Sequence, residues 1–300
     1  MIKRKKYTIE HIDAFEWLML RKPRTIHAVV TDPPYGVLEF SAEELVKKRS
    51  GIGGIWRLPI DYDGHKRNPM PRFTVLNELD HQRIRQFHGK LAPLLFKVLV
   101  PGGHVMIASQ NLLSHLAIHA FCTNGFELRG QIARIVKTLR GGDRPKNAHK
   151  KYPSTCVSPR SCWEPWLIFR KPCEGRVKDN LKKWHSGALR RREIDRPFAD
   201  LIPSNPARGI ERIIAPHPSL KPQSFIRQLV WASLPLGRGT ILDPFMGSGS
   251  TIAAAQYFGL RSIGLEMDKE YYELARRAID KLTGLEPTGP NSTHTPTNKA

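Results

Sequence analysis

The stretch that decides the fold is Thr240-Ile-Leu-Asp-Pro-Phe-Met-Gly-Ser-Gly-Ser-Thr251. Residues 240–242 predict a short buried strand, and the apolar run at 250–258 predicts a helix. Two glycines let the loop between them approach a ligand closely, and the N-terminus of the helix offers free backbone N–H groups. A second strand is expected at 262–265 and a second helix at 270–282. This order of elements indicates a parallel α/β unit.

An acidic residue follows at a distance that favours a nucleoside ligand. Glu266 ends the second strand, 19 positions after Gly247, where doubly wound folds bind ribose hydroxyls. A dinucleotide loop would carry glycine at Ile252, and a Walker loop would carry a lysine that is absent. An adenosyl cofactor without phosphates needs only close approach and a ribose carboxylate. The pattern therefore favours S-adenosylmethionine, with candidate contacts at Asp243, Gly247, Gly249 and Glu266.

Strands and helices alternate along most of the remaining chain. Strands are expected at 7–11, 26–30, 104–108, 126–136 and 166–169, and helices at 14–20, 84–98, 112–121 and 224–233. Pro101-Gly102-Gly103 is expected to end the helix at 84–98 before the next strand. The predicted fold class is α/β, with a Rossmann-like doubly wound sheet that is mostly parallel and carries an antiparallel hairpin.

The same patterns suggest how the chain is organised. Residues 1–136, with a long loop at 36–79, and residues 215–283 are expected to form one catalytic domain. Residues 137–214 form a basic region that lends the strand at 166–169 to the core. The Pro-, Thr- and Asn-rich tail at 284–300 is expected to be disordered. No stretch of about 18 apolar residues and no signal-peptide core is present, so a cytoplasmic protein is expected.

Positive charge dominates the composition. Lys and Arg number 48 against 27 Asp and Glu, a formal net charge of +21. From Arg129 to Arg196 there are 19 Lys and Arg against 6 Asp and Glu, with Tyr152 and three tryptophans interleaved. Such a segment predicts contacts with the phosphates of double-stranded DNA, although a short run such as Arg190–Arg192 is also typical of a solvated surface. The four cysteines lack zinc-ligand spacing, so no metal is expected.

A second motif, Thr31-Asp-Pro-Pro-Tyr-Gly36, follows the expected strand at 26–30. Its two prolines prevent continuation as a strand or a helix, so a rigid turn is the simplest interpretation. A polar motif at the carboxyl end of a strand also lies where open α/β sheets place their chemistry. Together with the loop at 243–249, this motif resembles the β-group DNA amino-methyltransferases, in which the target-base motif precedes the cofactor motif.

Other segments resemble the same family in the same order. The resemblance covers about residues 7–38, 80–136, 163–172 and 215–282, and it is weakest at 217–222, where Ser219 and Leu220 replace the family's Thr and Gln. It implies a target-recognition region inserted in the methyltransferase sheet, and an enzyme of prokaryotic or phage origin. The supporting segments are Ile9–Leu18, Val98–Gly103, Glu164–Phe169, His217–Pro222 and Ile263–Glu266.

The resemblance implies transfer of a methyl group from S-adenosylmethionine to an exocyclic amino group, with adenine N6 favoured. The carboxylate of Asp32 and the carbonyl of Pro33 would accept the two amino hydrogens, and Tyr35 would stack on the flipped-out base. Asp13 would contact the adenine of the cofactor, although N-capping of a helix is an equally good interpretation. Asp243 would lie near the methionine end. The full set of implied cofactor contacts adds Asp32, Lys221 and Phe245.

Several alternatives stay open. N4-methylation of cytosine needs the same fold and mechanism, and an RNA methyltransferase or a non-catalytic nucleic-acid-binding protein could keep the cofactor pocket. Intact Asp32, Tyr35, Gly247 and Glu266 argue against an inactive protein. Pro172-Cys173 resembles the nucleophilic pair of cytosine C5 methyltransferases, but no activating neighbour can be identified. A homodimer and a cognate restriction enzyme are both compatible with the sequence.

Overall fold

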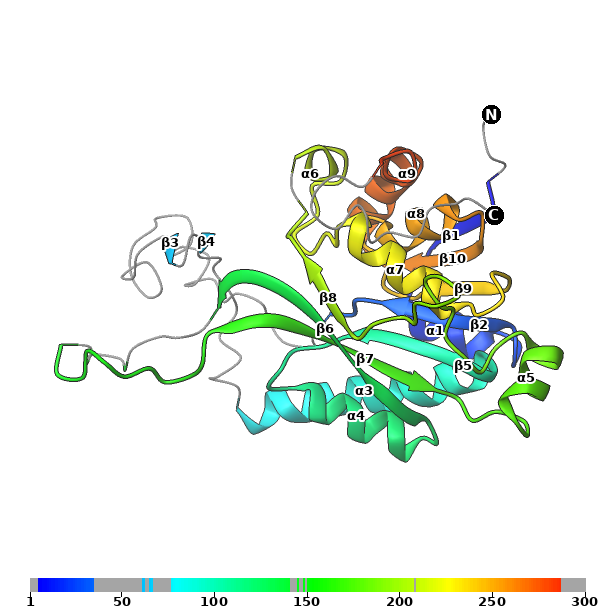
Figure 1. Ribbon diagram of the computed structural model, residues 1–300, viewed down its shortest axis with the longest axis horizontal. Helices are drawn as coiled ribbons and strands as arrows, with labels where there is room; N and C mark the ends of the chain where they lie inside the picture. The colour runs from blue at the N-terminus through cyan, green and yellow to red at the C-terminus, as the bar shows by residue number, and fades with distance from the viewer. Residues whose placement is uncertain are drawn as a thin grey trace.

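The computed structural model describes residues 5–34, 61–62, 65–66, 77–140, 145, 148, 150–207 and 209–286. Its main feature is an eight-stranded mixed sheet in the order β1-β10-β9-β2-β5-β7-β6-β8, with helices on both faces (Figure 1). A separate two-stranded pair is formed by β3 (Asp61–Tyr62) and β4 (His65–Lys66). The strands of the main sheet are β1 (Tyr7–His11), β2 (Ile26–Thr31), β5 (Leu99–Ala108), β6 (Glu127–Arg140), β7 (Ser161–Arg170), β8 (Leu201–Ser204), β9 (Thr240–Asp243) and β10 (Arg261–Glu266).

The order of the strands defines where a ligand can bind. Strands β1, β10, β9, β2 and β5 are parallel, whereas β7 is antiparallel to both β5 and β6. Strand β8 pairs in parallel with β6. The chain leaves β2 toward β5 and leaves β9 toward β10, in opposite directions, so a topological switch point lies between β2 and β9. The predicted doubly wound, mostly parallel fold with an antiparallel hairpin is confirmed.

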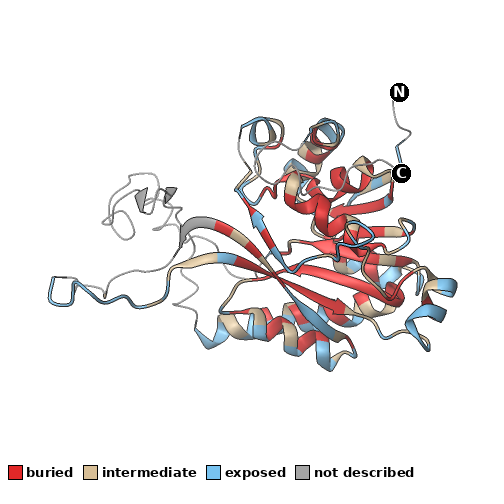
Figure 2. Ribbon diagram, viewed as in Figure 1, coloured by how far each residue is buried: buried red, intermediate tan, exposed pale blue. Residues whose placement is uncertain are grey.

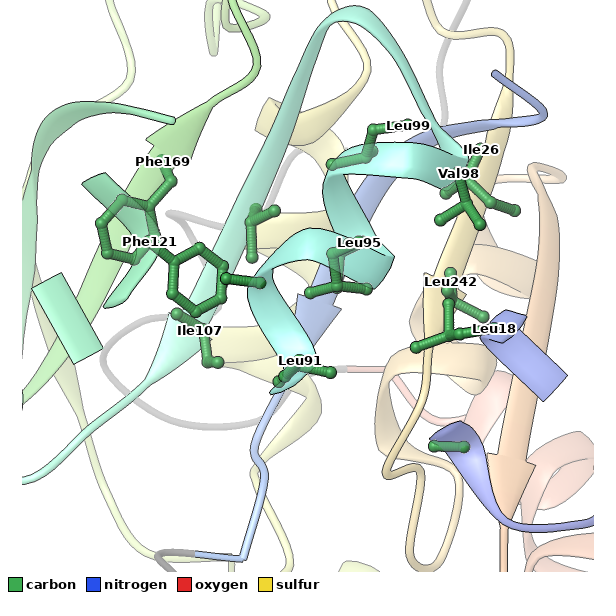
Figure 3. Close-up of a cluster of buried hydrophobic side chains, with 14 of the residues drawn as sticks. Leu18, Ile26, Leu91, Leu95, Val98, Leu99, Ile107, Phe121, Phe169 and Leu242 are labelled. Carbon is green, nitrogen blue, oxygen red and sulfur yellow. The ribbon is translucent and has the colours of Figure 1, made fainter. Parts of the chain in front are cut away.

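Apolar cores lie on both faces of the sheet. Helices α1, α3 and α4 bury Leu91, Leu95 and Phe121 on one face (Figure 3), and α7 and α8 bury Phe225 and Leu229 on the other. The central strands are almost fully buried (Figure 2), as expected for parallel strands covered by helices on both sides. The helices are α1 (Ala14–Leu20), α3 (Glu78–Val98), α4 (Ser114–Thr123), α5 (Val177–Trp184), α6 (Ile210–Ile214), α7 (Gln223–Ser233), α8 (Ser250–Tyr257) and α9 (Lys269–Thr283).

The prediction for Pro101-Gly102-Gly103 was wrong. These residues do not form a turn between a helix and a strand, because β5 already begins at Leu99 and runs through them. The register against β2 shifts here, so the extra residues form a bulge. Gly102 has φ of +77°, and its N–H donates to the carbonyl oxygen of Lys171 at 3.0 Å. Pairing within the sheet therefore overrides the local turn pattern.

The basic region divides between the two edges of the sheet. Strands β6 and β7 pair as far as Arg140 and Ser161, well past the end of β5, and project as an arm from the carboxyl edge, where β2, β5, β9 and β10 end (Figure 1). We call residues 150–163 with the end of β6 the β6–β7 arm. At the opposite, amino edge, Ser186 Oγ donates to the Pro101 carbonyl at 2.7 Å. There the Arg190 guanidinium stacks on the Trp231 ring at 3.4 Å.

Much of two predicted segments lies outside the described residues. Of the long loop at 36–79, the structure describes only β3, β4, Asn77, which caps α3, and the first two residues of that helix. Of the expected tail at 284–300, it describes residues 284–286, and Leu285 packs against the core of α8 and α9. Within the part of the chain that is described, no helix is long and apolar enough to span a membrane.

Candidate active site

Three acidic side chains gather at the carboxyl edge of the sheet. Asp32 follows β2, Asp243 ends β9 and Glu266 ends β10, and these three strands are neighbours. Thr31 connects the first two, because its Oγ1 donates to Asp243 Oδ1 at 2.7 Å. The switch point between β2 and β9 therefore brings the two sequence motifs together, although they lie more than 200 residues apart.

Asp243 is a buried carboxyl group surrounded by donors. Only 3% of the residue is exposed, and its Oδ1 also accepts the N–H of Phe245 at 3.2 Å. Burial raises the pKa of the Asp243 carboxyl from 3.8 to about 7, while hydrogen bonds from Thr31, Thr251 and the Phe245 N–H oppose that shift. Near neutral pH this side chain is therefore close to the midpoint of its titration.

Glu266 organises the glycine-rich loop. Its Oε2 accepts the N–H of Gly247 at 2.9 Å, and its Oε1 accepts the N–H of Asp268 at 2.8 Å. Burial raises the pKa of the Glu266 carboxyl above its ordinary value, although these backbone hydrogen bonds favour the charged form. Each carboxylate oxygen has two acceptor positions, so both can bind a further hydroxyl group.

The two glycines of the loop serve different purposes. Gly247 has φ of +50°, and a Cβ there would meet the ring of His217 at 3.1 Å, so the left-handed backbone and the close approach of His217 both favour glycine at this position. Gly249 has φ of +85°, and a Cβ there would lie 2.5 Å from Ile279 of α9. Packing of α8 against α9 by itself accounts for glycine at position 249.

Asp13 lies beside this loop, at the end of β1. Ile12 N–H donates to the carbonyl oxygen of Glu266 at 3.0 Å, which fixes the end of β1 against the end of β10. The Oδ1 of Asp13 accepts the N–H groups of Phe15 at 2.8 Å and Glu16 at 3.1 Å. Asp13 is thus the N-cap of α1, and contact with a cofactor would be a second role for the same carboxylate.

The other predicted residues lie around this centre. The Phe245 ring packs against Phe87, with ring centroids 5.6 Å apart, and forms the boundary with α3. Pro33 is buried beside Asp32, whereas Pro34 is exposed. Tyr35 lies outside the described residues.

Lys221 pairs with the candidate catalytic carboxylate. Its Nζ donates to Asp32 Oδ2 and lies 3.6 Å from Glu164 Oε1. The side chains are 10% exposed for Lys221, 16% for Asp32 and 7% for Glu164. Lys221, expected among the cofactor contacts, therefore binds directly to the residue expected to contact the target base.

Several residues of this site were not predicted from the sequence. Thr31 directly precedes Asp32, and its place beside a candidate catalytic residue was the available signal. Glu164 was recognised only as the first residue of a segment that resembles the family. His217 packs edge-on against Tyr271 at 4.3 Å, and burial lowers the pKa of His217 to about 4, so it is neutral near pH 7. Arg134 occupies an inward position of β6, between buried Ile132 and Val136. The only feature of the sequence that could have predicted its role is a charged residue on the apolar face of a strand in which apolar and polar residues alternate.

The residues present fit S-adenosylmethionine. The Glu266 carboxylate can accept two hydroxyl groups, and Asp243 offers a carboxyl group at the start of the loop. No phosphate-binding lysine or third glycine is present in the loop. Within the described ranges, no three His, Cys, Asp or Glu side chains come together in a way that could hold a metal ion.

Comparison with known proteins gives a consistent result. The sequence model of a DNA methylase family, N6_N4_Mtase, matches residues 26–277. The type II methyltransferase M2.DpnII of Streptococcus pneumoniae is 24% identical over 278 residues, which cover 92% of this chain and 90% of the relative.

Solved structures share the fold. The M1.HpyAVI–SAM complex has a TM-score of 0.54 at 19% identity and covers 93% of this chain and 100% of its own. The cytosine-N4-specific PvuII DNA methyltransferase has a TM-score of 0.57 at 13% identity and covers 96% of this chain and 89% of its own.

Proposed function

The chain belongs to the N6/N4 DNA methylase family and is an S-adenosylmethionine-dependent DNA methyltransferase, and from that premise we propose that it methylates the N6 amino group of an adenine flipped out of double-stranded DNA. The observation that carries amino-methylation is the position of Asp32, and the choice of adenine rests on the resemblance, in which aspartate at the first position of this motif favours adenine. Asp32 directly follows β2, its carboxylate pairs with Lys221, and the neighbouring Thr31 hydroxyl binds Asp243 of the cofactor loop.

The chemistry requires an acceptor at this position. The lone pair of an adenine amino group is delocalised into the ring, so the nitrogen is a poor nucleophile. Hydrogen bonds from its two N–H groups to Asp32 and to the carbonyl of Pro33 would favour a pyramidal nitrogen and free the lone pair. Bound S-adenosylmethionine supplies a methyl group on a positively charged sulfur. Methylation of the nitrogen would displace the neutral thioether and release one proton from the amino group, and the Asp32 carboxylate would accept that proton.

Two features of the site support this assignment of Asp32. Pro33 and Pro34 restrict the backbone after the strand, and Lys221 holds one oxygen of the carboxylate. A preorganised acceptor of this kind needs little reorganisation during the reaction, which is how such groups accelerate it. Tyr35, the expected stacking platform for the flipped base, belongs to the same proposal.

We assign the β6–β7 arm to DNA contact. It projects from the same edge of the sheet as Asp32, and it carries the exposed Lys150, Lys151 and Tyr152. Arg190–Arg192, by contrast, lies at the amino edge, where Arg190 stacks on Trp231. Within residues 137–214, the proposed target-recognition region, we therefore assign DNA contact to the β6–β7 arm and not to Arg190–Arg192.

N4-methylation of cytosine is the alternative function, since the PvuII cytosine-N4 enzyme shares the fold. Mass spectrometry of nucleosides from DNA of cells that express the chain distinguishes N6-methyladenine from N4-methylcytosine. The type II designation of M2.DpnII supports the further proposal that a cognate restriction enzyme cleaves the same sequence, which resistance of the methylated DNA to that enzyme would test.

The proposed role of Asp32 is tested with Asp32→Ala in a single-turnover assay with labelled cofactor on unmethylated genomic DNA. We expect the rate to fall about 10²–10³-fold, as when one positioned electrostatic group is removed. Asp280→Ala is the control, because Asp280 on α9 pairs with Lys5 at 2.8 Å, away from the carboxyl edge. A folded Asp32→Ala protein with the rate of the wild type would refute the proposed mechanism.

A further inference from the structure

A chain of four buried charges of alternating sign runs from the antiparallel part of the sheet to Asp32. Arg134 Nη1 lies 2.7 Å from Glu164 Oε2, Glu164 Oε1 lies 3.6 Å from Lys221 Nζ, and Lys221 donates to Asp32. The exposed fractions of the side chains rise along the chain, from 5% for Arg134 to 16% for Asp32. Two positive and two negative groups balance one another, as buried charges must.

The first half of this chain is rigid. Arg134 on β6 donates from Nε to Ser204 Oγ of β8 at 3.1 Å and from Nη2 to the Asn205 carbonyl at 3.3 Å. Glu164 on β7 accepts from Arg134 and from Trp166 Nε1 at 3.4 Å. Three paired strands therefore fix the Glu164 carboxylate before any ligand binds (Figure 1).

The second half depends on a flexible side chain. A lysine ammonium is a point charge on four methylene groups with many rotamers, so it takes its position from the anions around it. Here Glu164 and Asp32 both lie within ion-pair distance of Nζ, which also donates to the Ser219 carbonyl at 3.5 Å. Without the charge of Glu164, the Lys221 ammonium would be held less firmly and could move together with the Asp32 side chain. The Asp32 carboxylate would then lose a counter-ion of fixed position.

We propose that Glu164 is a positioning residue for methyl transfer: it holds the Lys221 ammonium in place and thereby fixes the carboxylate of Asp32 against the target amino group. Arg134 serves the same end by fixing Glu164. This inference rests on the proposed function, since it assumes that Asp32 acts on the target amine. A displacement of about 1 Å at a reacting group lowers rates by up to about 10²-fold, which sets the size of the effect.

The test is Glu164→Gln, which keeps the shape of the side chain and removes its charge. In single-turnover reactions at saturating cofactor and DNA, we expect the rate to fall about 10- to 100-fold, with the DNA dissociation constant changed less than threefold. Glu127→Gln is the matched control: Glu127 pairs with Arg170 across the same two strands at 2.6 Å, but at the amino edge. This control should keep the rate of the wild type, and an equal rate loss in both variants would overturn the proposal.

A double-mutant cycle with Lys221→Met separates positioning from a general structural role. If Glu164 acts through Lys221, adding Glu164→Gln to Lys221→Met should lower the rate less than twofold further, and the effects of the two changes on urea unfolding should also be non-additive. The proposal would be overturned if the double variant showed the product of the two single rate losses and the sum of the two single losses of unfolding free energy.

Should Glu164→Gln fail to fold, Glu164→Asp keeps a negative charge near Arg134 and Lys221 but shortens the side chain by one methylene group, so that it no longer holds the Lys221 ammonium in place. It should fold and still lose rate, and a folded Glu164→Asp with the rate of the wild type would overturn the proposal. An inactive Asp32→Ala beside a fully active Glu164→Gln would remove this inference alone. A fully active Asp32→Ala would remove the proposed function as well.

Discussion

Replacing Asp243 by asparagine should change how the stability of the protein depends on pH. The carboxyl group is 3% exposed and accepts hydrogen bonds from Thr31 at 2.7 Å and from the Phe245 N–H at 3.2 Å. An asparagine side-chain oxygen can accept the same two bonds, so the substitution removes the titration and largely keeps the contacts.

The size of the effect follows from the pKa of Asp243, which burial raises from 3.8 to about 7. Each pKa unit corresponds to about 1.4 kcal/mol. Ionisation of this group therefore lowers the free energy of unfolding by up to about 4 kcal/mol. Between about pH 4 and pH 7 the folded state binds this proton and the unfolded state does not, so the free energy of unfolding falls as the pH rises. Above about pH 7 both states are ionised and the dependence ends.

Urea unfolding of both proteins from pH 4 to pH 8 measures this contribution. Buried His88, His104 and His217 have pKa values lowered by burial to about 4, 3 and 4, and they titrate in the opposite sense. They are present in both proteins and cancel in the difference. Relative to the wild type, Asp243→Asn should gain stability between pH 4 and pH 7, and parallel curves for the two proteins would refute the reasoning.

The remaining predictions concern the loop and the DNA surface. Glu266→Ala should weaken S-adenosylmethionine binding by about 1.5–3 kcal/mol, the range for a lost charged hydrogen bond; calorimetry that finds unchanged affinity in the folded variant would exclude Glu266 from the cofactor site. Replacing Lys150 and Lys151 by alanine should make the plot of log DNA affinity against log salt concentration less steep, by up to about 2 units of slope. Arg191→Ala should leave the slope unchanged, because Arg191 lies at the amino edge; the opposite ranking would place the DNA on that edge.

Local patterns in the sequence were sufficient for the elements and for the two motifs. The strand at 26–30 was predicted from a short apolar run that ends at Asp32-Pro-Pro, and the helix at 84–98 from apolar residues that fall on one helical face. The predicted helix at 112–121 is found two residues later, at Ser114–Thr123. The loop at 243–249 was recognised because a tight turn between a strand and a helix requires particular residues at particular positions.

What the sequence alone determined was therefore the fold class, the order of the motifs and the family to which the chain belongs. Only the tertiary structure decided that Pro101–Gly103 forms a bulge within β5, that Arg190 and the β6–β7 arm lie at opposite edges, and that Glu164 faces Lys221. These features depend on which strands pair and in what register. Strand order and register arise from packing between residues far apart in the chain, and a local pattern carries no information about that packing.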